Sequence, residues 1–451
     1  MRVPAGGPPF RSLREAGIGP CRGHGLAVGA AAARCDHRVG RSPRRGPAPT
    51  RRGRGVPGRI RTDDAGRDPI GGEGAVRRAE RATLVDALAE TRHTTWRLVD
   101  AIDPGALRAD GPGGALLARL GRIGWRQERW CLRDAAPGRG DAPSLLPGSD
   151  AWFGAPDAPA AALPGLDTVR IWMDAVLVAV LERLAALPDD DVGLQPARRA
   201  LFHEHAQQEA MLASLAARGL PAPPSAVAPP VAMRLGADVT VPAAEAMIGF
   251  APEDGFAYAV ERDAHPVRLE RFDISLQAVT NAEYLQFVED GGYARPEFWS
   301  PEAFARLAQE GRTAPARWRR LGQRWQMRWF DRWLPLEAYA PVVHVDAYEA
   351  EAWCAWAGRR LPTEAQWEHA AATLDAFDWG DTVWEWTAST LAPYPGYRPD
   401  ACDAPPPFGV HRIVRGGSFA TPRDRLDRRQ RRALAPGRAD AFVGLRSCAL
   451  A

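Results

Sequence analysis

The sequence contains no lysine and a single asparagine, Asn281, although it has 451 residues. Its 58 basic side chains are therefore all arginine, and alanine, glycine and proline are also abundant. This combination is typical of a GC-rich coding bias, so the number of arginines alone says little about function. The length is sufficient for two or three domains, and the apolar content of 45% is that of an ordinary soluble protein.

Long apolar runs and paired cysteines are also missing. No apolar run approaches the roughly 20 residues that span a membrane, so we expect no membrane partner. The cysteines form no Cys-x-x-Cys pair and no zinc spacing. A disulfide framework is not expected in so long a chain, which favours a reducing, cytoplasmic location. The six cysteines are Cys21, Cys35, Cys131, Cys354, Cys402 and Cys448.

Charge is concentrated at the N-terminus. Residues 1–75 carry 15 arginines against 6 acidic residues, about +9, so the formal charge of +3 leaves about −6 for the remainder. A basic arm can bind nucleic acid through phosphate groups. This arm is rich in glycine and proline, lacks periodicity and has no aromatic residues interleaved with its arginines. We therefore expect a disordered or wrongly assigned extension without nucleic-acid binding.

Residues 76–220 show helical periodicity. Apolar residues recur at three- and four-residue steps, and a long Pro/Gly/Ala-rich loop over 136–165 separates two helix pairs. This pattern predicts an up-down four-helix bundle, followed by a proline-rich linker at 221–230. His93 falls on the solvent side of the first helix. The predicted helices are 76–104, 114–134, 166–188 and 194–218.

Residues 231–451 have a different texture, with clustered tryptophans, short strand-like pieces and frequent turns. The pattern predicts a loop-rich α+β domain. We expect one clear amphipathic helix, Asp346–Ala357, before a second helix at Thr363–Ala372. Thr363 and Gln366 form the capping box of that second helix.

Several ordered motifs identify the C-terminal part. Arg360–Glu368, Val383–Trp386 and Arg415–Ser418 resemble the signature of the formylglycine-generating-enzyme-like, or sulfatase-modifying-factor, domain. The resemblance covers about 245–450 and implies a C-type-lectin-like fold. Many of the matched residues have a structural explanation, because buried arginine and glutamate side chains pair with one another. The residues that we assign mainly to this scaffold are Arg360, Glu364, Glu368, Glu385 and Arg415.

One activity of that fold is not expected here. The copper-dependent formylglycine-generating enzymes need a pair of cysteines near the C-terminal end, whereas Arg415–Leu450 contains Cys448 alone. One thiol cannot supply two thiolate ligands. We therefore predict that Cys448 is a small buried apolar residue.

The helical part carries a second resemblance. Residues 80–220 are similar to the DinB-like four-helix domain of the iron-dependent sulfoxide synthases of ergothioneine biosynthesis. The matching stretches are Gly121–Arg133 and Phe202–Met211, while Pro143–Phe153 resembles the selenoneine synthases. The resemblance implies a non-haem Fe(II) cofactor, O₂, and two small-molecule substrates, trimethylhistidine and a sulfur or selenium donor.

The family's iron is held by three imidazoles, two of them at i and i+4 on one helix face. The resemblance places these ligand positions at Arg122, His203 and Gln207, so only His203 is a competent ligand. Gln207 offers a weak carbonyl oxygen, and Arg122 offers no lone pair and a permanent positive charge. His205 points about 160° away from His203 on an ideal helix, so we expect His203 to be a buried histidine, hydrogen-bonded to Gln207 or to the surroundings of Arg122.

The substrate side is also altered. Gly154–Ala162 replaces a loop that carries polar and basic residues in the family. Arg438 remains and could hold a substrate carboxylate. Tyr394 or Tyr397 corresponds to the family's proton-donating tyrosine, and packing within the turn is an equal alternative for both.

Three interpretations stay open at this point. The first is an enzyme that joins a sulfur or selenium donor to the imidazole of trimethylhistidine. The second, which the replaced ligands favour, is a metal-free pseudoenzyme that acts as a binding or partner protein. The third is a lectin-like binding module without catalytic history, which accounts for the C-terminal part but not for the helical part.

Overall fold

A computed structural model provides the fold of this chain. The described residues belong to one compact unit. The basic arm and the predicted linker residues 225–230 lie outside the described part of the chain. No helix within that part is long and apolar enough to cross a membrane. The described residues are 75–108, 116–134, 142–154, 162–224, 236–380, 382–400 and 405–450.

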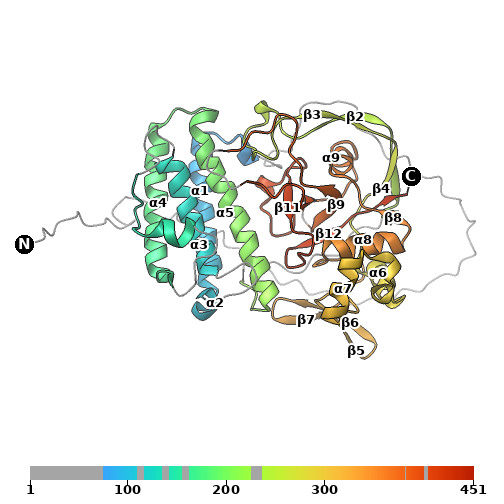
Figure 1. Ribbon diagram of the computed structural model, residues 1–451. Coiled ribbons are helices and arrows are strands. Elements are labelled where there is room, and N and C mark those ends of the chain that lie inside the picture. The colour runs from blue at the N-terminus through green and yellow to red at the C-terminus, as the bar shows by residue number, and fades with distance from the viewer. Residues whose placement is uncertain are drawn as a thin grey trace, which may run out of the picture. The chain divides into compact units, whose positions relative to one another are not determined.

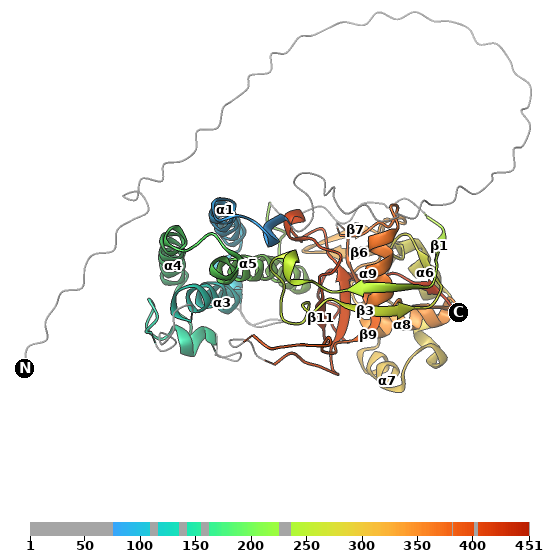
Figure 2. The ribbon, with the colours of Figure 1, turned by 90° about the horizontal axis from the view of Figure 1, so that it is seen from above.

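Helices make up the first part of the described chain, and the four long ones pack against one another (Figures 1 and 2). The predicted positions are confirmed to within a few residues, except that the first segment is divided. It forms a 3₁₀ turn, η1 (Ala75–Arg77), then α1, then the short α2. The helices are α1 (Arg81–Asp100), α2 (Pro104–Arg108), α3 (Leu116–Glu128), α4 (Leu166–Ala186) and α5 (Asp191–Arg218), with π-helical turns η2 (Arg129–Arg133) and η3 (Asp150–Gly154).

Helix α5 is the element that faces the C-terminal part, and its ends are well defined. Asp190 is its N-cap and accepts a hydrogen bond from the Gly193 amide at 2.7 Å. Gly219 ends the helix in the left-handed conformation, at φ 64°, where a residue without Cβ is favoured. Its amide reaches back to the carbonyls of Leu215 and Ala216.

The C-terminal part is built from short strands in several small sheets. Four strands form a sheet in the order β1-β4-β13-β8, and four others form the order β11-β10-β9-β12. In the second sheet, β12 runs parallel to β9 while the other neighbours are antiparallel. The strands are β1 (Asp238–Val241), β2 (Ala244–Ile248), β3 (His265–Leu269), β4 (Phe272–Ser275), β5 (Trp318–Leu321), β6 (Arg324–Trp329), β7 (Arg332–Pro335), β8 (Arg359–Arg360), β9 (Trp384–Thr390), β10 (Arg412–Gly416), β11 (Arg432–Leu434), β12 (Val443–Leu445) and β13 (Cys448–Ala449).

Four helices accompany these strands, so the expectation of one helix before the Arg360–Glu368 motif was wrong. Both missed helices carry start signals: Thr280 forms a capping box with Glu283, and Ser300 caps a helix that begins with proline. The capping box predicted for α9 is confirmed. The helices are α6 (Asn281–Glu289), α7 (Pro301–Glu310), α8 (Ala347–Trp356) and α9 (Glu364–Thr373).

Buried ion pairs hold this loop-rich part together, as the sequence predicts. Arg446 donates to both oxygens of Glu385 at 2.7 Å. Arg415 pairs with Glu364 and Glu368, each at 2.9 Å. Such bidentate and shared pairs satisfy charges that a core with little regular structure would otherwise leave unpaired.

The remaining scaffold residues agree with this picture. Arg360 donates to the Gln366 side chain at 2.9 Å. Cys448 is fully buried on β13, and burial raises the pKa of its thiol to about 11. It therefore packs as a small apolar residue, as predicted.

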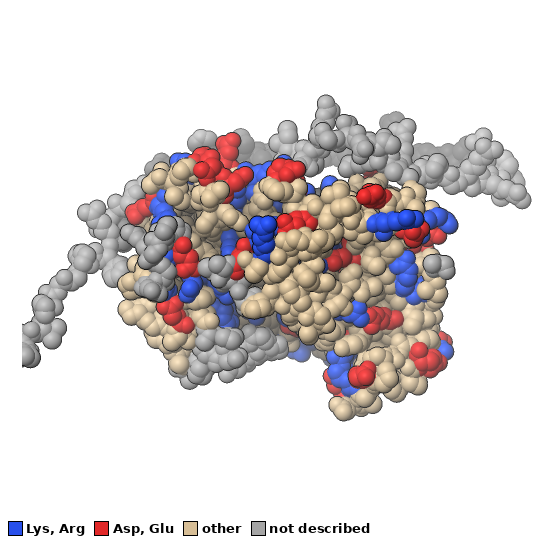
Figure 3. All heavy atoms as spheres, turned by 45° about the horizontal axis from the view of Figure 1, so that its top comes forward, with Lys and Arg blue, Asp and Glu red and all other residues tan. Residues whose placement is uncertain are grey.

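Surface charge is mixed on the face drawn in Figure 3. Blue arginines and red carboxylates are interspersed over the described residues of that face. A nucleic-acid-binding surface would typically gather arginines into one patch or stripe.

Candidate functional site

A cavity of about 440 Å³ is lined by residues from both parts of the fold. Arg126 of α3 and Ala206 of α5 form its helical side. The C-terminal part contributes two aromatic side chains, Tyr258 and Tyr397, and a group of arginines. The cavity therefore lies beside the helix turn that carries His203, and its size suits a small molecule.

His203 is a neutral imidazole in cationic surroundings. Its ring packs edge-on against Trp130, with centroids 5.4 Å apart. Burial lowers the pKa of His203 to about 3, assisted by the charges of Arg126, Arg199, Arg425 and Arg119. Its Nε2 is buried and has no hydrogen-bond partner in the described structure, so this atom does not make the expected hydrogen bond to Gln207 or to the surroundings of Arg122.

Gln207 and Arg122 lie in the same region of the fold, but neither side chain can act as a metal ligand. Arg119 Nη1 donates to Gln207 Oε1 at 3.1 Å. Burial lowers the pKa of Arg119 to about 10, and the nearby charges of Arg438 and Arg122 add to the effect. The positions that the family resemblance assigned to iron thus lie within a cluster of guanidinium groups.

The residues present do not fit the family's Fe(II). The unpartnered Nε2 of His203 is a suitable ligand atom, but the other two positions hold an engaged amide oxygen and a cation. The guanidinium groups that disfavour a proton on His203 repel a dication with twice the charge. Within the described ranges, no group of three His, Cys, Asp or Glu side chains is arranged to hold a metal ion.

Neighbouring polar residues do not complete a metal site at the predicted positions. The Nε2 of His205 lies 2.8 Å from the Thr91 hydroxyl, on the α1 side of the helix. Glu204 accepts from Arg92 at 2.9 Å. His93 is exposed, as predicted. His205 and Glu204 belong to a polar network between α1 and α5, not to the cavity.

Glu209 is the last acidic residue of the α5 motif, and it joins the two parts of the fold. Its Oε1 accepts from Trp384 Nε1 and from Arg432 Nη1, both at 2.7 Å. The hydroxyls of Ser418 and Thr421 complete its contacts at 3.1 Å. Burial raises the pKa of this carboxyl group, but Arg432, Arg425 and the hydrogen bonds outweigh burial and lower it overall.

The two predicted tyrosines have different surroundings. Tyr394 accepts from Arg415 at 2.9 Å and donates to Glu364 at 3.4 Å. The Arg431 guanidinium lies over its ring at 3.8 Å. These are scaffold contacts, and Tyr394 does not line the cavity. Tyr397 does line it, with its ring edge-on to Phe408.

Tyr258 is a cavity residue that sequence reasoning missed. Burial raises the pKa of its phenol to about 12, and the charge of Arg425 partly opposes this rise. Its segment, Phe256–Ala259, carries no chemical pattern that would single it out. Only the folding of this loop against α5 brings the hydroxyl to the arginines.

Arg438 is already engaged within the chain. It donates to both oxygens of Asp440 at 2.8 Å and lies close enough to lower the pKa of Arg119. Binding of a substrate carboxylate at Arg438 would have to compete with Asp440. Most of the altered loop Gly154–Ala162 lies outside the described residues.

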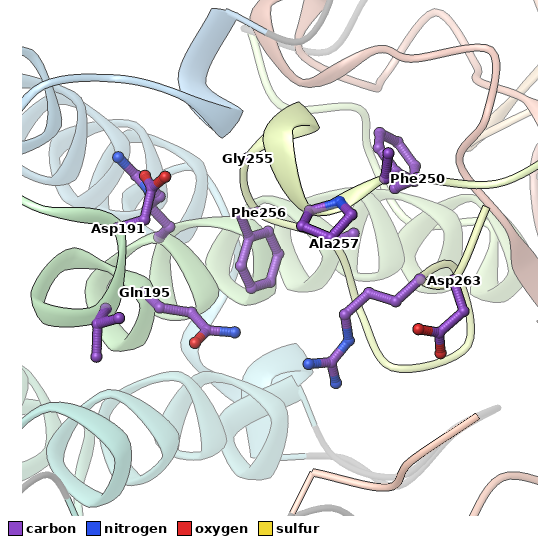
Figure 4. Close-up of a pocket in the computed structure, with 12 residues that line it drawn as sticks. Asp191, Gln195, Phe250, Gly255, Phe256, Ala257 and Asp263 are labelled. Carbon is purple, nitrogen blue, oxygen red and sulfur yellow. The ribbon is translucent and has the colours of Figure 1, made fainter. Parts of the chain in front are cut away.

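A second cavity of about 230 Å³ lies farther towards the start of α5 (Figure 4). Asp191 and Gln195 of α5 face Phe256 and Ala257 of the opposing loop. Its two arginines are paired, Arg198 with Asp191 at 2.6 Å and Arg262 with Asp400. This cavity offers no uncompensated charge comparable to that of the larger one.

Comparison with known proteins identifies the family of this chain. Residues 225–382 and 372–450 match the sulfatase-modifying factor enzyme 1-like domain. The hercynine oxygenase of Mycolicibacterium smegmatis is 33% identical over 407 residues, covering 75% of this chain and 92% of that protein. The hercynine oxygenase of Mycolicibacterium thermoresistibile is 34% identical over 427 residues, covering 81% and 94%.

A solved structure, PvdO from Pseudomonas aeruginosa, covers 49% of this chain and 99% of its own at 18% identity, and its TM-score of 0.31 supports no further argument. The domain match confirms the assignment of the C-terminal part. The similarity to the two oxygenases continues through the helical part and spans nearly all of their length. This chain therefore belongs to the hercynine oxygenase family, the sulfoxide synthases of the ergothioneine pathway.

Proposed function

We propose that this chain is a ligand-binding member of its family, which takes hercynine, the trimethylated histidine, and does not hold Fe(II). The observation that carries the proposal is the contact between Arg119 and Gln207 beside His203. This hydrogen bond engages one predicted ligand position, Gln207. A second predicted position, Arg122, is itself a cation. The chain would then be a pseudoenzyme that retains a substrate cavity.

The cavity suits a zwitterion such as hercynine. Its arginines, Arg126 and Arg425 among them, attract a carboxylate through charge-assisted hydrogen bonds. The rings of Tyr258 and Tyr397 offer faces that attract a quaternary ammonium group. The proposal assigns ligand contact to Tyr397 and leaves Tyr394 in the scaffold.

The domain organisation is part of the same proposal. Residues 76–220 would form a DinB-like four-helix domain, 221–230 a linker, and 231–451 the sulfatase-modifying-factor domain. Arg438 would reach substrate only after releasing Asp440.

A second candidate function is the oxidative coupling of a sulfur or selenium donor to hercynine, with Fe(II) and O₂. Two observations favour it. The identity to hercynine oxygenases spans 92% and 94% of those proteins, and His203 Nε2 has no partner among the described residues. When bound, iron would supply the activation of O₂. The side chains at the predicted ligand positions Arg122 and Gln207 argue against this candidate function.

One pair of titrations separates the two candidates. The full-length chain and its His203→Ala variant are titrated with Fe(II) under anaerobic conditions by calorimetry, and then with hercynine without metal. We expect saturable hercynine binding and no Fe(II) binding in either protein. Tight Fe(II) binding that disappears in His203→Ala, together with hercynine-dependent O₂ consumption, would refute the proposal and establish the second candidate.

A further inference from the structure

Arg425 is a buried cation without a hydrogen-bonded counter-ion. It lies on the 3₁₀ turn η8 (Arg423–Arg425), and the residue is only 4% exposed. Its Nε and Nη1 atoms are buried without hydrogen-bond partners in the described structure. An unpaired buried charge is strongly unfavourable, so such a group usually has a partner or binds one.

Other buried arginines of this fold have carboxylate partners, which Arg425 lacks in the described structure. Arg77 has Glu261 at 3.6 Å and Asp427 at 3.9 Å. Arg415 has two glutamate partners at 2.9 Å. The described residues place no carboxylate at ion-pair distance from Arg425. Its cation–π contact with Phe202, 5.6 Å from the ring centroid, supplies no hydrogen-bond acceptor for the Nε and Nη1 donors.

Glu209 cannot serve as the missing partner. Glu209 influences the pKa of Arg425, which burial lowers and which Tyr258 and Glu209 raise in part. The oxygens of Glu209 are already engaged by Arg432, Trp384 and two hydroxyls, as described above. The charge of Arg425 therefore stays uncompensated within the described chain.

Arg425 is one of the residues that line the 440 Å³ cavity. Arg126, Arg432 and Arg425 line it together with Tyr258. The acidic residue of that lining is Asp400, which pairs with Arg262 and lies 3.6 Å from Arg199. Hydrogen-bond donors and positive charge thus dominate this side of the cavity.

We infer that the cavity is an oxyanion site, in which a phosphate or sulfate group, free or as part of a small molecule, binds against Arg425. Arg126 adds positive charge, and the Tyr258 hydroxyl adds a donor. This inference goes beyond the proposed function, since the ligand needs neither an imidazole nor a trimethylammonium group.

The test uses the full-length chain with inorganic phosphate and sulfate as probes, and sodium chloride at matched ionic strength as reference. Phosphate or sulfate should raise the thermal unfolding temperature of the wild type above that in chloride. Titration calorimetry should show saturable binding. In Arg425→Met, affinity should fall at least tenfold, while stability in chloride should not fall, because an unpaired buried charge has been removed.

Arg423→Met is the matched control, because Arg423 is an exposed arginine of the same turn; it should keep the anion response. Tyr258→Phe provides a second variant and should weaken binding without abolishing it. A phosphate response that persists in Arg425→Met would overturn the inference, as would an Arg425→Met protein that is destabilised equally in all buffers. Hercynine binding without any anion response would overturn this inference alone and leave the proposed function intact.

Discussion

Replacing Glu209 with alanine should destabilise the whole fold, because this carboxylate ties α5 to the C-terminal strands. It is 2% exposed and accepts hydrogen bonds from Trp384 and Arg432 at 2.7 Å. Both donors belong to the second sheet, on β9 and β11. Alanine at this position leaves one buried indole N–H and one arginine without an acceptor.

The expected loss is large for a single side chain. Removing one partner of a buried ion pair typically costs about 3–5 kcal/mol, since the other charge stays desolvated. A folded domain of ordinary stability has about 5–15 kcal/mol in total. The Glu209→Ala protein should therefore unfold at much lower urea concentration. Tryptophan fluorescence is a suitable signal, because Trp384 donates directly to the deleted group.

The pH dependence gives an independent check. The pKa of Glu209 is lowered in the folded state from its ordinary value of 4.5. Its contribution to the free energy of unfolding is therefore complete above pH 4.5 and is lost as the pH falls through the folded-state pKa. The stability difference between wild type and Glu209→Gln should shrink over that acidic range.

The matched control is Glu182→Ala, which removes an exposed glutamate of α4. It should change the free energy of unfolding by less than about 0.5 kcal/mol. If Glu209→Ala were no more destabilising than this control, the carboxylate would not join the two parts of the fold, and the reasoning would be refuted.

Three further predictions concern the metal position, the packing of α3 and a helix cap. The double variant Arg122→His, Gln207→His should raise the affinity for Fe(II) by at least about tenfold, or 1.4 kcal/mol. Anaerobic calorimetry measures this affinity. No gain in affinity would mean that the surrounding guanidinium groups exclude the metal by themselves. Gly121→Ala would place a Cβ 2.1 Å from the Phe153 ring, so thermal unfolding should show a loss of about 1–3 kcal/mol, and a stabilised protein would contradict this packing. Thr363→Ala removes the hydroxyl that caps α9 and should cost about 0.5–2 kcal/mol; an unchanged urea midpoint would show that the cap contributes nothing.

Local chemistry explains which elements were predictable. Long helices with an apolar stripe, such as α4 and α5, were located to within a few residues because their periodicity is a strong signal. The α9 capping box was likewise evident from Thr363 and Gln366. The shorter α6 and α7 were overlooked although Thr280 and Ser300 carry N-cap signals for them.

The predicted metal positions show that hydrogen-bond partners are harder to predict than helix positions. Sequence reasoning predicted that Arg122, His203 and Gln207 form one set and that two of them are poor ligands. It did not identify Arg119 as the group that occupies Gln207. It also assigned a hydrogen bond to His203, whose Nε2 has none in the described structure. Helix spacing predicts which side chains share a face of the helix, but not which groups each side chain contacts.

The sequence by itself determined the family, and it predicted the order of the two parts and the absence of imidazoles at two ligand positions, because each rests on residue identities at fixed spacing. Only the tertiary structure decided where charge is left uncompensated. Arg126, Tyr258 and Arg425 come from distant segments and meet at one cavity, and Arg425 is a candidate anion ligand only because folding removes it from water without supplying a carboxylate. Desolvation depends on every group that surrounds a charge, and this information is absent from any local stretch of sequence.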